Sequence, residues 1–136
     1  PESLTYTLLH PKRQKTLKRK IEQLRASGVI LMVGTDSGIP MKFHCQSTWN
    51  ELDVWVRIMN IPPMEAIQAA TYWPARFMGV DDRWGTVTPG KFADIIAVKG
   101  DVLKHINLLQ HVDFVMQGGQ IFKQDGRVVE EFLEHN

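Results

Sequence analysis

The sequence has few of the residues that build covalent cross-links or membrane-embedded structures. Its 136 residues include one cysteine, Cys45, which excludes a disulfide within the chain and a cysteine-rich zinc site. No apolar run approaches the roughly 18–20 residues that a membrane-spanning helix needs. The first 15 residues also lack the basic-then-apolar order of a signal peptide. These absences predict a protein of a reducing compartment, most simply cytoplasmic, with no membrane partner.

An excess of one charge is also missing. The chain has 16 Lys and Arg against 15 Asp and Glu, so its net charge is +1, and this balance predicts no nucleic-acid partner. The one dense basic run lies in residues 12–20. We expect its side chains to spread over more than one face of a helix, which favours a solvated surface over a phosphate-binding patch.

What is present indicates a globular protein, because 43% of the residues are hydrophobic and 23% are charged. The apolar spacing in residues 11–27 predicts a helix, and Gly28 suits the position just after its end. The run VILMV at 29–33 is continuously apolar and β-branched at both ends, so it predicts a strand buried on both faces. A helix that feeds such a strand through a short turn is half of a parallel α/β unit.

The remaining elements change in character along the chain. A loop is expected over 38–47, followed by helices over 49–59, 64–73 and 74–79. After Gly79 the pattern favours strands: one over 93–98, a hairpin over 112–122 and a final turn at Asp125-Gly126. We therefore expect two domains, an α/β part in residues 1–79 and a small β unit in residues 80–136.

The strand predicted at 29–33 has no partners of similar quality in residues 1–79, although a buried strand needs neighbours on both edges. The chain also begins with Pro1 instead of Met. We expect either a homo-oligomer or, preferably, the C-terminal end of a larger protein that requires its N-terminal part.

Four stretches, in this order and spacing, resemble the C-terminal part of the metal-dependent amidohydrolase superfamily. They are GVILMVGTDSG, NELDVWVRIMNIPPMEAIQAATYWPARFMG, GTVTPGKFADIIAVKGD and VDFVMQGGQIF. The branch they resemble most holds imidazolonepropionase-like and Xaa-Pro dipeptidase-like enzymes, and the resemblance covers roughly residues 20–130. It implies the C-terminal slice of a (β/α)8 barrel of the TIM type, followed by half of a small β-sandwich that completes a composite domain.

The resemblance also assigns a role to Asp36, which matches the aspartate at the end of the eighth barrel strand. In the family that residue ligates the metal and takes a proton from the water that attacks the scissile carbonyl. Independently of the family, active sites of such barrels lie at the carboxyl ends of the strands. A carboxylate there can hold Zn²⁺ and receive a proton from a water whose pKa the metal lowers. Without the resemblance, the residues favour Asp36 as a turn or helix-capping residue over a catalytic one.

His44 follows in the expected loop, at the rim where a substrate would bind. It is a candidate substrate-binding residue, and the alternative is a surface or loop-packing role. The family's His-x-His pair, lysine and two further histidines have no counterpart in this chain. Since a zinc site needs about three protein ligands, we expect the fragment by itself to be inactive and to hold no Zn²⁺.

The sequence thus predicts part of a hydrolase that cleaves C–N bonds in an amide, a cyclic amide or a dipeptide, with one or two Zn²⁺ ions in the intact enzyme. Two alternatives stay open. The chain is a non-catalytic truncated fragment or interaction module that needs a partner chain, or a separate chain supplies the missing strands of a split enzyme.

Overall fold

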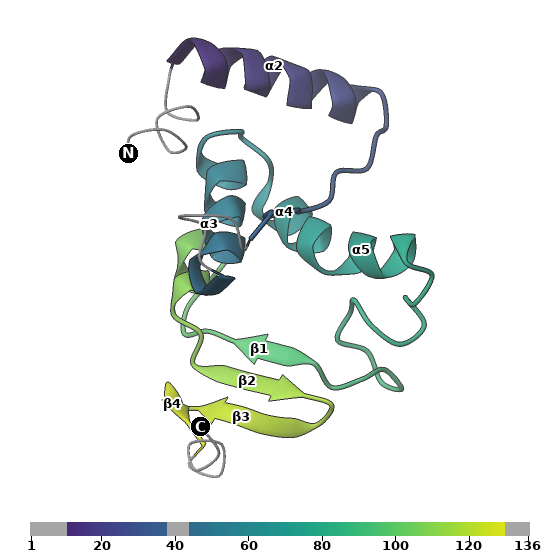
Figure 1. The fold of residues 1–136 in the computed structure, drawn as a ribbon, viewed down its shortest axis with the longest axis vertical. Coiled ribbons are helices and arrows are strands. Elements are labelled where there is room, and N and C mark those ends of the chain that lie inside the picture. The colour runs from purple at the N-terminus through teal and green to yellow at the C-terminus, as the bar shows by residue number, and fades with distance from the viewer. Residues whose placement is uncertain (1–10, 38–43, 130–136) are drawn as a thin grey trace.

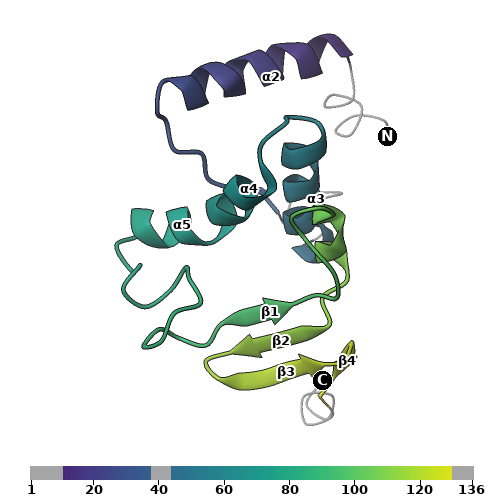
Figure 2. The same cartoon turned by 180° about the vertical axis from the view of Figure 1, so that it is seen from behind.

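The computed structural model describes residues 11–37 and 44–129 of the chain. Its helices occupy one end and the middle of an elongated molecule, and an antiparallel sheet occupies the other end (Figure 1). Helix α2 (Pro11–Ala26) crosses the end farthest from the sheet, and the view from behind shows the same arrangement (Figure 2). Among the described residues, no helix is both long and apolar enough to cross a membrane.

Helix α2 spans Pro11–Ala26 and confirms the helix predicted over 11–27. Its end has a physical cause in the backbone. The amide of Gly28 donates to the carbonyl of Arg25 at 3.0 Å, and the amide of Val29 donates to the carbonyl of Leu24 at 3.1 Å. This double closure needs a left-handed residue, and Gly28 supplies it with φ at 77°.

The prediction of a strand at residues 29–33 is wrong. In the described part of the chain this segment is extended, but it belongs to no sheet. Its side chains alternate from Leu31 onward: Leu31 and Val33 are half-buried and Met32 is exposed. Val29 and Ile30 are exposed as well. The apolar composition is that of a doubly covered strand, but a strand forms only where neighbouring chains accept its hydrogen bonds.

Three further helices form the middle of the molecule. Helix α3 spans His44–Arg57, α4 spans Pro63–Ala70 and α5 spans Tyr72–Phe77. Helix α3 thus begins earlier than expected, and its first residues were predicted as loop. The break between α4 and α5 falls at Thr71 instead of Pro74, because a proline is tolerated in the first turn of a helix. Gly79, with φ at 68°, lies just beyond the end of α5, where the sequence predicts a helix end.

The core lies where α3, α4 and the 3-10 helix η1 (Ile106–Gln110) meet. Its buried side chains are Leu52, Met59, Ile61, Ala66 and Ile106. Leu31 and Val33 of the extended segment pack against it, as do Leu17 and Ile21 of α2. The sequence patterns did not indicate η1, since its five residues are too few for a clear helical period.

The sheet is antiparallel in the order β1-β2-β3-β4. Its strands are β1 (Ile95–Ala97), β2 (Phe114–Gln117), β3 (Gln120–Gln124) and β4 (Arg127–Val128). The hairpin predicted at Gly118-Gly119 and the turn at Asp125-Gly126 are both confirmed. All four turn residues have positive φ, as two-residue hairpin loops of the primed type require. The division into domains at residues 79 and 80 stays a prediction.

Candidate functional site

Asp36 lies at the end of the extended segment that leaves α2. The segment is held against the helices by its alternate side chains and by a backbone hydrogen bond from the amide of Val33 to the carbonyl of Ala69 at 3.0 Å. The alternation continues to its end, so Thr35 and Ser37 are half-buried and Asp36 between them is exposed. Because successive residues of an extended chain face opposite sides, anchoring its neighbours makes Asp36 face outward.

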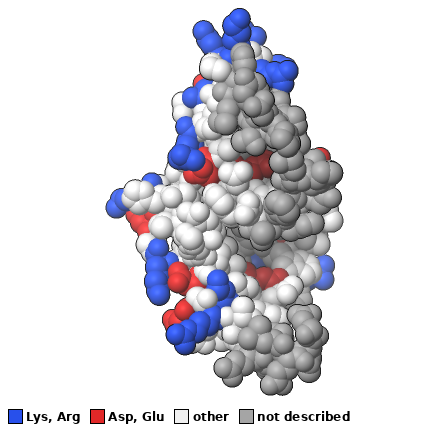
Figure 3. Space-filling model, turned by 60° about the vertical axis from the view of Figure 1, so that its left-hand side comes forward, with Lys and Arg blue, Asp and Glu red and all other residues white. Residues whose placement is uncertain are grey.

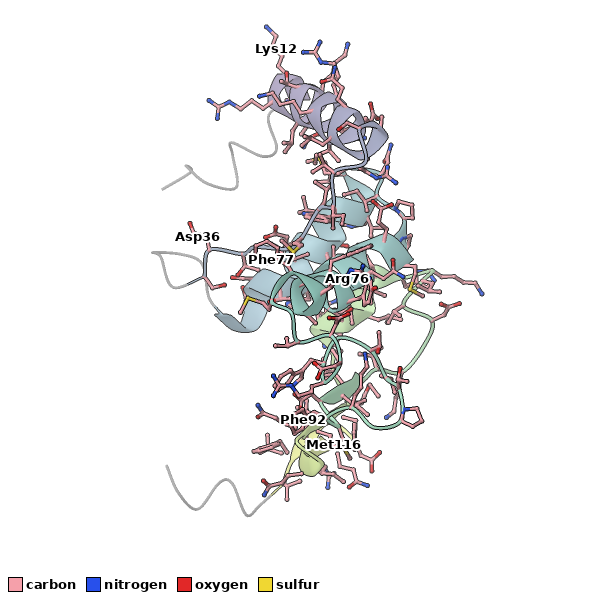
Figure 4. All side chains as sticks on the ribbon, turned by 90° about the vertical axis from the view of Figure 1, so that its right-hand side faces the viewer. Lys12, Asp36, Arg76, Phe77, Phe92 and Met116 are labelled. Carbon is pink, nitrogen blue, oxygen red and sulfur yellow. The ribbon has the colours of Figure 1, made fainter. Side chains whose placement is uncertain are left out.

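The backbone at Asp36 turns sharply, with φ at 50°. This left-handed conformation is uncommon outside glycine, and aspartate is among the residues that adopt it most readily. The hydroxyls of Thr35 and Ser37 are hydrogen-bonded to each other across the turn, with their oxygens 2.6 Å apart. Figure 4 labels Asp36 at the margin of the molecule. No hydrogen bond or ion pair engages its carboxylate among the described residues, so this oxygen pair is available to another group.

His44 is the first residue of α3. Its side chain lies outside what the structure describes, so the structure does not show whether it approaches Asp36. A contact of His44 with substrate therefore stays a prediction.

Within the described ranges, no group of three or more His, Cys, Asp and Glu side chains could hold a metal ion. A protein zinc centre takes three or four ligands of these types. These residues therefore do not fit a complete metal centre, and Asp36 offers a single carboxylate.

Sequence patterns did not predict the ion pair that holds the end of α2, where the extended segment leading to Asp36 begins. Arg25, in the last turn of α2, donates from Nε and Nη2 to the two carboxylate oxygens of Glu65 in α4, at 2.7 and 2.6 Å. The hydrogen bond with Glu65 raises the pKa of Arg25 above its usual range. The two residues are 40 positions apart, and no local spacing rule links residues at that separation.

A second pair, Asp53 and Arg57, lies within α3. Arg57 donates to both oxygens of the buried Asp53 carboxylate. The i,i+4 spacing is the signal from which it could have been found.

One hollow of the described surface is distinct from the surroundings of Asp36. It is an apolar groove of about 800 Å³ between α4, α5 and β1, lined among others by Met64, Ile67, Tyr72, Trp84 and Ile96. Asp36 is not among the lining residues. The one carboxylate there, Asp94, already accepts hydrogen bonds from Trp84 Nε1 at 3.0 Å and from the Gly118 amide at 2.7 Å. We therefore read this groove as structural.

Comparison with known proteins gives consistent similarities. Residues 11–122 match the profile of the amidohydrolase family. A solved Xaa-Pro dipeptidase with bound methionine in its active site is 33% identical, with a TM-score of 0.68 over 83% of this chain and 26% of that one. The ochratoxinase of A. niger is 29% identical, with a TM-score of 0.64 over 82% of this chain and 25% of that one. An adenine deaminase of Clostridium perfringens is 41% identical over 69 residues, which are 51% of this chain and 11% of that protein. The chain thus spans about a quarter of the length of these solved structures and a smaller share of the deaminase.

Proposed function

Because the chain belongs to the amidohydrolase family, we propose that it forms the C-terminal part of an enzyme that hydrolyses C–N bonds. In this proposal the residues up to Gly79 belong to a TIM-type barrel, and residues 80–136 belong to a small β-sandwich. The observation that carries the proposal is Asp36, an exposed carboxylate in a left-handed turn at the end of an apolar extended segment. Barrel enzymes present their catalytic groups at the carboxyl ends of their strands, and in this proposal the segment is such a strand in the intact barrel.

Asp36 is the proton acceptor in this proposal. Hydrolysis of a C–N bond joins a water oxygen to carbon, breaks the bond to nitrogen and moves one water proton to the leaving nitrogen. A carboxylate beside the water can accept that proton and then return it to the nitrogen as general acid. The unengaged carboxylate of Asp36 supports this role, and the turn keeps it facing away from the protein body.

Zinc belongs to the proposal as the metal suggested by the resemblance. Amidohydrolases generally use a divalent metal, and Asp36 would be one ligand. Since the described residues contain no three-ligand group, the other ligands must come from segments that the structure does not describe. No step of the mechanism is assigned to the metal on this chain.

A dipeptide with proline in second position is the substrate class we favour, with His44 as a substrate-binding residue. The 33% identity to a Xaa-Pro dipeptidase over most of the chain supports it. Removal of the amino group of adenine is a second candidate, favoured by the 41% identity to an adenine deaminase over a shorter stretch.

The test measures hydrolysis of methionyl-proline as release of proline, and hydrolysis of adenine as release of ammonia. Both assays use the purified chain and any longer polypeptide that contains it. We expect Asp36→Asn to lower turnover at least a hundredfold, because the amide does not accept the proton. Asp125→Asn is the matched control, since Asp125 has the same φ of 50° in the turn after β3. Equal activity of Asp36→Asn and the parent would remove Asp36 from the mechanism. Absence of turnover and of bound metal in both polypeptides would instead support a non-catalytic interaction module.

A further inference from the structure

Five basic residues of α2 share one exposed face: Lys12, Arg13, Lys15, Arg19 and Lys20. At 3.6 residues per turn they fall within an arc of about 160°. The two other basic residues of the helix, Lys18 and Arg25, are half-buried and lie outside this arc. We call these five residues the α2 basic face. Lys18 keeps part of the spread over more than one face that the sequence predicts, but the other five basic residues of the run at 12–20 share this arc.

The orientation of this face is fixed by contacts on the opposite side of the helix. Leu17 and Ile21 pack against the core, and Arg25 is held by Glu65. Helix α2 therefore cannot turn its cations toward the protein. Figure 1 shows it lying across one end of the molecule, and Figure 3 shows basic side chains gathered at that end.

The α2 basic face has little counter-charge on its own helix. Glu22 is the one acidic residue in the helix, and its first turn has none. In the described part of the chain, none of the five cations takes part in an ion pair. The helix N-terminus adds a partial positive charge to the same region. An external polyanion would relieve this repulsion.

We propose that the α2 basic face binds the phosphate backbone of double-stranded nucleic acid without reading its sequence. Lys12, Lys15 and Arg19 rise along the helix in steps of about 4.5 and 6 Å, so they can meet several phosphates of one strand. Phosphate contacts from Lys and Arg are sufficient for non-specific binding. This proposal is independent of the hydrolase proposed above.

The composition of the face favours a duplex over other polyanions. The face contains no aromatic residue for stacking on unpaired bases, and it has no apolar side chain to insert into a bilayer. A stable protein partner would need an apolar centre, which this face also lacks.

The experiment measures binding of the 136-residue chain to fluorescent 20-base-pair DNA duplexes of two unrelated sequences, by anisotropy, between 50 and 200 mM salt. We expect equal affinity for both sequences and a slope of log K against log salt of about −4.5, the value for five phosphate contacts. The double variant Lys15→Gln/Arg19→Gln should reduce the slope by about 2.

The matched control is Lys99→Gln/Lys104→Gln, which removes the same charge from two lysines that are 79% and 77% exposed and lie outside α2. It should bind like the parent, and circular dichroism checks that both variants keep their helices. Equal weakening by the two double variants would overturn the proposal, since net charge alone would then explain binding. Preference for single strands or for vesicles containing phosphatidylserine would overturn it as well, and so would no binding to duplex at 50 mM salt.

Discussion

Arg25 and Glu65 form a two-pronged ion pair that joins the end of α2 to the first turn of α4. Both carboxylate oxygens are engaged, at 2.7 and 2.6 Å, and the two side chains are 32% and 37% exposed. The extended segment that leads to Asp36 begins only a few residues after Arg25. This contact therefore sets where that segment starts.

Replacing Arg25 by Ala should destabilise the fold by about 1 kcal/mol, because the pair is two-pronged but partly solvated. Urea unfolding of the parent, Arg25→Ala, Glu65→Ala and the double variant gives the coupling energy between the two residues. The exposed pair Lys104–Asp101 is the control, and its cycle should give almost no coupling. Comparable coupling in both cycles would mean that the two-pronged geometry contributes nothing.

The Arg25–Glu65 contact should be insensitive to alkaline pH. The pKa of Arg25 is raised by its hydrogen bond to Glu65. The stabilisation that this contact gives the fold is therefore fully present at any pH below the pKa of Arg25 in the unfolded chain. This stabilisation is lost only as the pH rises through the higher pKa of Arg25 in the folded chain, which lies above the pH range of ordinary buffers. We expect the stability difference between the parent and Arg25→Ala to stay constant between about pH 7 and pH 10. A decline within that range would show that another group governs the contact.

The turn at Asp36 should tolerate residues that accept a left-handed backbone. Asp36→Gly and Asp36→Asn are expected to keep the stability of the parent, because glycine has no Cβ and asparagine, like aspartate, adopts the left-handed region readily. Asp36→Ala should lose about 1 kcal/mol, because alanine has a Cβ but lacks the short polar side chain that favours this region. Thermal unfolding measures the three variants. If alanine proves as stable as glycine, the turn carries no backbone strain. Stability with loss of turnover in Asp36→Asn would separate the chemical role from the structural one.

Gly85 and Gly90 form a matched pair that tests how closely the loop after α5 packs against that helix. Their φ values are 92° and 90°, but a Cβ on Gly85 would lie 2.8 Å from the Cβ of Ala75, whereas a Cβ on Gly90 would meet nothing within 4 Å. Both alanine variants carry the same backbone strain. Gly85→Ala should therefore be less stable than Gly90→Ala by about 1–3 kcal/mol, because the added Cβ overpacks the contact with Ala75. Equal urea midpoints would place the loop farther from α5 than the structure has it.

Local patterns were sufficient for the elements whose causes are local. Gly28 ends α2 as predicted, and the two hairpin turns form where consecutive residues accept positive φ. The break between α4 and α5 was misplaced because proline marks a helix start only within the first turn, and several positions satisfy that condition.

The candidate site was predicted only in part. The sequence and its family resemblance selected Asp36, and the structure gives this residue an exposed, left-handed turn. Neither the hydroxyl bridge between Thr35 and Ser37 nor the anchoring of the segment by Arg25 and Glu65 was predicted. These contacts depend on how the chain packs, and residue order alone does not specify them.

The sequence by itself determined the order of helices and turns, because helical period, capping and positive φ depend on neighbouring residues. Only the tertiary structure decided the fate of residues 29–33 and the placement of the α2 charges. A strand needs partners that no local pattern supplies, so an apolar run with strand composition remains extended and unpaired in the described residues. The direction in which a charged helix face points likewise depends on which opposite face is packed, and here Leu17 and Ile21 decide it.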